Sequence, residues 1–221
     1  MIITIDGPCA SGKSTIARLI ALHTGIYYVS SGYIYRAVAY GLSKDHGYTR
    51  ETIHAPDATI VHDVISRIAY AYHNGAEHVT YDNVDVTTLL KNSAIDPLAS
   101  IVSANEHVRE LVNTCIRNIA KKHSLVIDGR DCGSVIFPGA DYKYYVSASL
   151  PERARRWCVM QKKLGNMYDG AQCELLVHER DTRDMSRATA PLIVPRGACV
   201  IDATDFSAQQ VADVILQQIK V

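Results

Sequence analysis

Short apolar runs and stretches of helical periodicity alternate along most of this chain. Residues 2–5 are apolar and end at Asp6-Gly7, a pattern that predicts a buried strand followed by a tight turn. Across residues 13–23 the apolar positions fall on one helical face, and Gly25 follows where a helix C-terminus favours glycine. Residues 26–29 predict a second strand. A strand, a helix and a strand in so short a segment form a βαβ unit, which implies a parallel sheet covered by helices.

The second half of the chain continues this alternation. Buried strands are predicted at residues 125–127, 142–146 and 200–201, and helices at residues 106–122 and 151–163. Ser207 is a suitable N-cap for a closing helix, whose apolar positions are Val211, Val214, Ile215 and Ile219. The order of the elements predicts an α/β fold in which crossover helices join the strands of a central parallel sheet.

The middle of the chain departs from this rhythm. Residues 69–72 and 79–81 are rich in aromatic and β-branched side chains, and Asn74-Gly75 lies between them. Asn-Gly between two such runs predicts a β-hairpin, because both residues accept a positive φ. A small antiparallel sheet inserted in a parallel α/β fold is typical of an added substrate-binding part.

Composition narrows the class of protein. The chain of 221 residues is 48% hydrophobic, which suits one domain, with or without insertions, around a substantial core. Basic and acidic residues each number 23, so the zero net charge gives no support for a nucleic-acid or membrane-surface protein. The chain has no long apolar run, and its start, MIITIDG, lacks the pattern of a signal peptide. We therefore expect a cytoplasmic protein that binds neither nucleic acid nor membrane.

Cysteines and histidines carry no metal-binding pattern. The six cysteines, at positions 9, 115, 132, 158, 173 and 199, form no C-x-x-C pair. We interpret them as reduced thiols of a cytoplasmic protein. The nine histidines lack the spacings of zinc ligands, so a protein-held zinc site is not expected.

One segment carries the chemistry of phosphate binding. Gly7, Gly12, Lys13 and Ser14 satisfy the pattern G-x-x-x-x-G-K-[ST], which arises by chance in such a chain with a probability on the order of 1%. The glycines let backbone N–H groups curl around phosphate oxygens, and the following helix directs its positive N-terminus at the same anion. Lysine then reaches the β and γ phosphates, and the serine hydroxyl binds Mg²⁺. The segment predicts a P-loop, since it follows a strand and opens a helix.

Nucleotide binding alone does not define a kinase, because GTPases, motor ATPases and regulatory proteins also use P-loops. The chain has no T/N-K-x-D segment, which reads guanine in GTPases. Asp128 follows an apolar run and fits a Walker-B-like strand, whose aspartate holds Mg²⁺ directly or through water. The alternative is that Asp128 is a turn or helix-capping residue.

Arginines gather in the segment ERDTRDMSRATAPL. Arg180, Arg183 and Arg187 are spaced three and four apart, so we expect them on one helical face. A solvated helix with surface ion pairs is one interpretation. In a chain with a P-loop, the other interpretation is that these arginines are catalytic, because phosphoryl transfer depends on positive charge around the moving group. Arg36 and Arg130-Asp131 follow predicted strand ends, where ligands bind in open α/β sheets, although surface ion pairs are an alternative there too.

Over nearly its whole length the chain resembles bacterial cytidylate kinases. The segments that carry the resemblance are IDGPCASGKST, SSGYIYR, DVT, the run from Ser100 to Arg109, DGRDCGSVIFPGAD and RDTRDMSRATAPL. It implies a three-layer P-loop kinase fold with a central parallel sheet in a single domain, residues 1–221. Within that domain it implies an acceptor-binding insert at residues 33–105, which contains a small antiparallel sheet, and a helical lid at residues 152–190.

The resemblance also implies an activity: Mg²⁺-dependent transfer of the γ-phosphoryl group of ATP to CMP or dCMP, in a monomer. With the motifs above, it implies that ATP phosphates bind Gly7, Pro8, Cys9, Ala10, Ser11, Gly12, Lys13, Ser14 and Thr15. The implied acceptor-binding residues are Ser31, Tyr35, Arg36, Ser100, Arg109, Arg130, Asp131 and Arg183. The implied catalytic residues are Lys13, Arg130, Asp131, Arg180 and Arg187, and the metal ligands are Ser14 and Asp128.

Two positions depart from the family pattern. Ser30 stands where relatives carry an aspartate near the sugar, which leaves the choice between ribose and deoxyribose open, and Met185 stands where many carry another lid arginine. Two alternatives stay beside the main hypothesis, and only the second draws support from these departures. One is a P-loop kinase for another nucleotide or a small metabolite, and the other is a regulatory protein that binds nucleotide without turnover.

Overall fold

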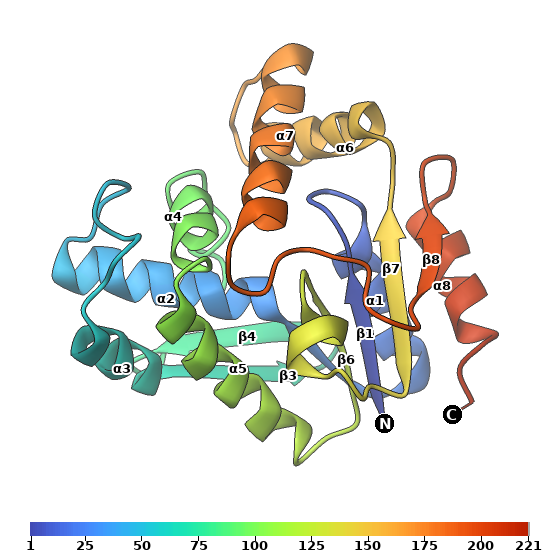
Figure 1. Cartoon of the computed structure of the whole chain (residues 1–221), viewed down its shortest axis with the longest axis horizontal. Helices are drawn as coiled ribbons and strands as arrows, with labels where there is room; N and C mark the ends of the chain where they lie inside the picture. The colour runs from blue at the N-terminus through green and yellow to red at the C-terminus, as the bar shows by residue number, and fades with distance from the viewer. Residues whose placement is uncertain (221) are drawn as a thin grey trace. The chain divides into compact units, whose positions relative to one another are not determined.

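A computed structural model of the chain describes residues 1–220, which form two compact units (Figure 1). The first, here called the P-loop unit, combines residues 1–28 with the chain from Ser124 onward. The second, here called the inserted unit, is Val29–His123. Among the described residues, no helix has the length and apolar character needed to cross a lipid bilayer.

A parallel sheet lies at the centre of the P-loop unit. Its strand order in the described chain is β2-β6-β1-β7-β8, and the pairs β1–β6, β1–β7 and β7–β8 run parallel. The strands are β1 (Ile2–Asp6), β2 (Tyr27–Ser30), β6 (Leu125–Gly129), β7 (Tyr142–Ser147) and β8 (Cys199–Asp202), and β2 runs on into the inserted unit. Side chains from β1 and β6 are buried on both faces, as a helix-covered parallel sheet requires. The predicted strands and parallel α/β architecture are confirmed.

Helices of the P-loop unit include those predicted at residues 13–23, at residues 151–163 and after Ser207, together with a turn that was not predicted. They are α1 (Lys13–Thr24), the π-helical turn η1 (Cys132–Ile136), α6 (Leu150–Lys163), α7 (Gly170–Ser186) and α8 (Ala208–Leu216). Gly25 ends α1 in the left-handed conformation, with φ 70°, and Ser207 caps α8 by accepting from the Gln210 N–H. The closing helix stops before Ile219, which is buried beyond its end.

The inserted unit combines helices with a small antiparallel sheet. Its elements are α2 (Ser31–His46), α3 (Ala58–Ser66), β3 (Ile68–His73), β4 (Ala76–Tyr81), β5 (Val84–Asp85), α4 (Ile95–Val102) and α5 (Glu106–Ala120). Asn74 and Gly75, with φ of 54° and 73°, turn β3 into β4, which confirms the hairpin. A third strand, β5, extends the sheet beyond that prediction.

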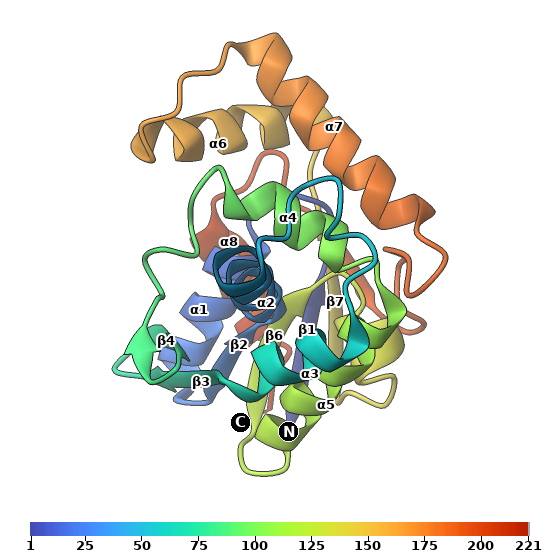
Figure 2. The ribbon, with the colours of Figure 1, turned by 90° about the vertical axis from the view of Figure 1, so that its left-hand side faces the viewer.

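Helix α2 was not among the predicted elements. Its buried residues lie on most of its circumference, so it lacks the polar face that reveals an amphipathic helix in a sequence. A Cβ added at Gly41 would lie 2.7 Å from Val64 and 2.8 Å from Tyr81. Glycine at that position therefore lets α2 pack closely on α3 and β4, and Figure 2 looks nearly along α2 at this arrangement.

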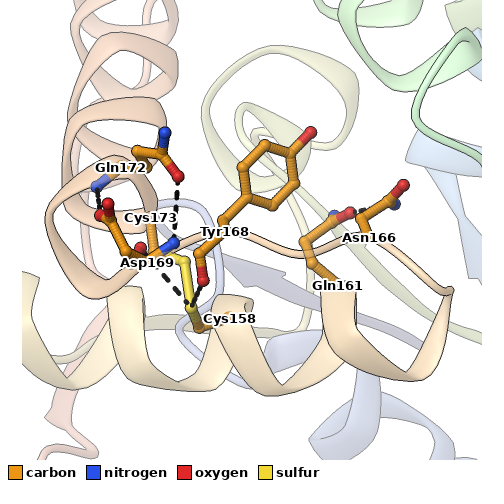
Figure 3. Close-up of a disulfide and its surroundings, with 7 residues drawn as sticks. All are labelled: Cys158, Gln161, Asn166, Tyr168, Asp169, Gln172 and Cys173. Carbon is orange, nitrogen blue, oxygen red and sulfur yellow. Dashed lines mark hydrogen bonds between the residues drawn. A yellow bond between two sulfur atoms is a disulfide. The ribbon is translucent and has the colours of Figure 1, made fainter.

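The interpretation of all six cysteines as reduced thiols is wrong. Cys158 on α6 and Cys173 on α7 form a disulfide with their Cα atoms 5.7 Å apart, whereas the other four are free thiols (Figure 3). The two cysteines are 15 residues apart, and they meet only because α6 and α7 pack as a helical hairpin. A capping box between Asp169 and Gln172 starts α7 beside the bond.

This disulfide is expected to stabilise the helical hairpin. Cys158→Ser should lower Tm by roughly 5–10 °C without reductant, because a bridge over such a loop contributes about 3 kcal/mol. With dithiothreitol present, the parent protein and the variant should unfold at the same temperature. Cys199→Ser, which removes an exposed free thiol, is the matched control. Equal Tm values for the parent and Cys158→Ser without reductant would contradict the prediction.

Candidate functional site

The segment from Gly7 to Ser14 connects β1 to α1 and has the backbone of a phosphate-binding loop. Gly7 has φ 151°, and a Cβ added there would lie 2.0 Å from the Val146 carbonyl oxygen, so a larger residue does not fit. Gly12, with φ 99°, stands at the N-cap of α1, where the first turn carries no acidic residue. The positive N-terminus of a twelve-residue helix is therefore directed at this loop without a neutralising carboxylate on its own first turn.

Lys13 is buried in the first turn of α1. Its Nζ donates a hydrogen bond to the Pro8 carbonyl oxygen at 2.7 Å, so the side chain curls back along the loop. Burial, reinforced by the nearby charge of Arg130, lowers the pKa of Lys13 to about 7. A buried amine of this kind gains the most from a polyphosphate, because the anion restores the solvation that the ammonium group has lost.

Asp128 lies at the end of β6 within hydrogen-bonding distance of the loop. Ser14 Oγ donates to Asp128 Oδ2 at 2.7 Å, and the Tyr28 hydroxyl donates to Oδ1 at 2.6 Å. The alternative of a helix-capping or turn residue fails, because Asp128 belongs to the buried strand itself. A hydroxyl and a carboxylate side by side are the hard oxygen ligands that Mg²⁺ prefers. Tyr28 was not predicted, since no motif marks it.

An ion-pair network surrounds the arginines at the end of α7. Arg130 Nε donates to Asp184 Oδ2 at 2.6 Å, and Arg187 lies 4.0 Å from the same carboxylate. Although burial disfavours their charges, Asp184 holds the pKa of Arg130 above its ordinary value, and Arg130 holds that of Asp184 below its own. Arg187 also donates to Asp131 at 3.5 Å. The interpretation of the segment as a solvated helix fails, because Asp181 and Asp184 are buried.

Arg187 lies outside the predicted helix. Helix α7 ends at Ser186, and Arg187 follows in extended backbone with φ −63° and ψ 140°. Its Nε donates to the Ala190 carbonyl oxygen at 2.6 Å, which turns the guanidinium back towards Asp131. The expectation of one helical face therefore holds for Arg180 and Arg183 but is wrong for Arg187. The turn that follows, with Ala190 at φ 52°, explains the difference.

A buried carboxylate that sequence reasoning missed joins α7 to the P-loop. Asp181 on α7 accepts a hydrogen bond from the Cys9 N–H at 2.8 Å and pairs with Arg153 on α6. Arg153 also donates to the Cys9 carbonyl oxygen at 3.2 Å. Both helices of the hairpin are thus tied to the loop. The alternation of acids and arginines in ERDTRD was the only signal, and it drew attention to the arginines alone.

Asp6, at the end of β1, is a second carboxylate that was missed. It accepts from the N–H groups of Cys132 and Gly133 at 2.8 and 2.7 Å, which anchors η1 directly after Asp131. Burial raises the pKa of Asp6 to about 6, although these two hydrogen bonds oppose the shift. A Cβ added at Gly133 would lie 2.7 Å from Thr4 Oγ1, so the turn approaches β1 as closely as glycine allows.

In the inserted unit, five predicted acceptor residues lie on three helices. Ser31, Tyr35 and Arg36 belong to the first turns of α2, Ser100 to α4 and Arg109 to α5. The buried Arg109 donates to the Ser103 carbonyl oxygen at 2.8 Å, and its guanidinium carbon lies 5.5 Å from the centre of the Tyr35 ring. Ser103 Oγ donates to the Ser100 carbonyl oxygen at 3.0 Å, so α4 and Arg109 are joined. The remaining expected acceptor residues, Arg130, Asp131 and Arg183, belong to the P-loop unit.

Comparison with known proteins assigns the chain to a family. The model of the cytidylate kinase family matches residues 3–221. The chain belongs to the cytidylate kinase family. Cytidylate kinases of Caldanaerobacter subterraneus subsp. tengcongensis and Mycoplasma pneumoniae are each 34% identical to it, over 99% and 98% of this chain and 94% and 95% of theirs. That of Geobacter sulfurreducens is 36% identical over 96% of this chain and 90% of its own.

Solved structures of low identity share the fold of this cytidylate kinase family member. An uncharacterised protein from Eubacterium ventriosum matches with a TM-score of 0.53 at 15% identity, covering 99% of this chain and 98% of that one. The protein TT1252 from Thermus thermophilus matches with a TM-score of 0.50 at 14% identity, over 100% of this chain and 98% of its own. At such identities the likeness concerns the backbone arrangement alone.

Proposed function

We propose that this protein transfers the γ-phosphoryl group of ATP to CMP or dCMP, giving ADP and the cytidine diphosphate. The observation that carries the proposal is the family match over residues 3–221, which contains the P-loop, the inserted unit and the arginine network in one chain. The three-layer kinase domain would use residues 33–105 for the acceptor and residues 152–190 as the lid. We propose further that it works as a monomer in the cytoplasm, where both substrates occur.

The P-loop unit would supply the donor side of the reaction. Backbone N–H groups from Gly7 to Thr15 and the N-terminus of α1 would hold the ATP phosphates, with Lys13 at the β and γ groups. Ser14 and Asp128, 2.7 Å apart, would hold Mg²⁺, which neutralises charge on the phosphates when bound. The side chains that would place positive charge around the transferring group are Arg130, Arg180, Arg183 and Arg187.

The acceptor side would use the inserted unit together with Arg130 and Asp131. Ser31, Tyr35 and Arg36 would bind the phosphate and sugar. Ser100, Arg109 and Asp131 would bind cytosine, because an acceptor faces its amino group and a donor faces its ring nitrogen and carbonyl. Uracil has a carbonyl in place of the amino group and an N–H in place of the accepting ring nitrogen, so it would leave buried groups unpaired. The group of CMP that receives the phosphoryl group is already a phosphate oxyanion, so the transfer requires no general base.

A coupled assay with ATP across CMP, dCMP, UMP and AMP tests this function. We expect turnover with at least one cytidine nucleotide and a kcat/KM for UMP at least ten times lower, in line with the cost of an unpaired buried polar group. Turnover with another acceptor alone would favour a kinase of different specificity. Tight ATP binding without turnover of any acceptor would favour a regulatory protein. The comparison of CMP with dCMP measures the sugar preference, which the departure at Ser30 leaves open.

ATP binding should be coupled to proton uptake through Lys13. The pKa of Lys13 is about 7 in the ligand-free protein, so near pH 8 most of the amine is neutral. Bound phosphates favour the charged form and raise this pKa, so affinity should fall as the pH rises above 7, by up to about tenfold per pH unit. Isothermal titration calorimetry in buffers of different ionisation enthalpy at pH 8 measures the uptake. Lys13→Met, which has no titrating amine, should lose it, and equal uptake by parent and variant would contradict the prediction.

A further inference from the structure

A carboxylate on α4 holds the arginine that the proposed function assigns to the acceptor phosphate. Arg36 Nε donates to Asp96 Oδ1 at 2.6 Å, and the two side chains are only 21% and 17% exposed. This pair lies within the inserted unit and joins α2 to α4. Partial burial and a short charge-assisted hydrogen bond distinguish it from a mobile surface ion pair.

Local backbone structure determines where Asp96 lies. The side-chain oxygen of Asn92 accepts from the N–H groups of Ala94 and Ile95 at 2.9 and 2.8 Å, and the Asn92 carbonyl oxygen accepts from the Asp96 N–H at 3.2 Å. This turn starts α4 at Ile95 and places Asp96 in the first turn of the helix. The positive end of the helix favours a carboxylate at this position, beside Arg36.

The guanidinium of Arg36 lies over the first turn of its own helix. Its NH1 atom is 2.9 Å from the position that a Cβ on Gly32 would take, so the side chain folds back into the space that glycine leaves. The first turn of α2 has no acidic residue, and Ser30 at its N-cap makes no capping hydrogen bond through its side chain in the described structure. With Nε engaged by Asp96, the guanidinium is presented at the positive end of a sixteen-residue helix.

We propose that Asp96 is a positioning residue, which holds the Arg36 guanidinium over Gly32 for the phosphate of the acceptor nucleotide. The inference rests on the proposed function and deepens it. A long side chain that is ordered before the ligand arrives loses less freedom on binding, so its contact with the phosphate is stronger. The competing hypothesis is that the Asp96 carboxylate competes with the phosphate for Arg36. The two effects change the KM for CMP in opposite directions.

Steady-state kinetics and equilibrium binding of Asp96 variants test the proposal. Asp96→Ala should raise KM and Kd for CMP by about tenfold, with kcat within about twofold of the parent. In Asp96→Asn the amide oxygen still accepts from Arg36 Nε, so KM and Kd for CMP should rise much less than in Asp96→Ala. Binding of cytidine, which has no phosphate, should be the same in the parent protein and in both variants. A purely structural role for Asp96 would weaken cytidine binding as well.

A double-mutant cycle shows whether Asp96 acts through Arg36. In an Arg36→Ala background, Asp96→Ala should have no further effect on Kd for CMP. Gly32→Ala gives an independent test, because its Cβ would lie 2.9 Å from Arg36 NH1 and force the guanidinium to shift, which should also raise the KM for CMP. Asp63→Ala is the matched control, since Asp63 forms an exposed ion pair with Arg67 at 3.4 Å in the same unit. Its KM should equal that of the parent.

Several results would overturn the proposal. An unchanged or lower KM for CMP in Asp96→Ala contradicts it, and a lower one shows that the carboxylate competes with the phosphate. An effect of Asp96→Ala that persists in the Arg36→Ala background means that Asp96 acts by another route. If Asp96→Ala does not fold, an unchanged KM in Gly32→Ala is the contradicting result. A parent protein that neither binds nor turns over CMP or dCMP removes the proposed function and this inference together.

Discussion

Replacing Lys13 with methionine is expected to lower kcat by about a thousandfold, because a positioned charge on the transferring phosphoryl group is lost. The variant should nevertheless stay folded. Lys13 is 5% exposed, and burial lowers its pKa to about 7, so the native fold bears a cost for the charged form. Methionine removes that cost at similar volume. We therefore expect the variant to have a Tm equal to that of the parent or higher, while turnover is nearly abolished.

Lys143→Met is the matched control for this prediction. Lys143 belongs to the same unit and also donates to backbone carbonyl oxygens, those of Pro138 and Arg196. It is partly exposed and lies on β7, far along the chain from the P-loop segment. Its kcat should match that of the parent protein. A Lys13→Met variant that retains more than a tenth of the parent kcat would show that the P-loop lysine does not act on the transferring group.

Arg187→Ala is expected to lower kcat by about a hundredfold with a small change in KM. The Arg187 side chain is 5% exposed, and hydrogen bonds to Ala190 and Asp131 hold its guanidinium in one place. A charge that is already oriented costs little reorganisation when negative charge moves during the transfer. Because removal also leaves Asp131 and Asp184 without this neighbour, part of the loss will come from repulsion between carboxylates and phosphates.

Two further variants separate these contributions. Arg187→Lys retains the charge but loses the planar fork, so it should recover part of the kcat. Arg155→Ala removes an arginine of α6 that is 66% exposed and pairs with Glu152, and it should leave kcat unchanged. A rise in KM without a fall in kcat for Arg187→Ala would show that Arg187 binds the substrate in the ground state only.

Elements whose signals are local were predicted from the sequence. The βαβ start, the glycine end of α1, the cap of α8 and the Asn74-Gly75 hairpin each depend on residues close together in the chain, so periodicity and turn chemistry suffice to find them. The phosphate loop belongs to the same class, because its glycines, lysine and serine lie within eight positions. Helix α2 was not predicted, because burial around most of its circumference removes the periodic alternation of apolar and polar positions.

The candidate site shows the limit of such reasoning. Its motif residues were found one segment at a time, but the carboxylates that hold them were not. Asp181 contacts Cys9 across 172 positions, and Asp96 contacts Arg36 across 60. Each of these acids looks in the sequence like an ordinary surface charge. Full burial of Asp181 and partial burial of Asp96 distinguish them, and burial is a property of the packed chain alone.

The sequence by itself determined the α/β class, the P-loop and the family, since these depend on local spacing and on motifs that a linear chain displays. Only the tertiary structure decided the partners of each charged group. Lys13 donates a hydrogen bond to a backbone carbonyl oxygen, Arg130 donates to Asp184, and Arg36 donates to Asp96. The tertiary structure also decided that Cys158 and Cys173 meet and that Arg187 leaves its helix. The physical reason is that ion pairs, disulfides and pKa shifts depend on distance and solvent exclusion, which arise when segments distant in the chain pack together.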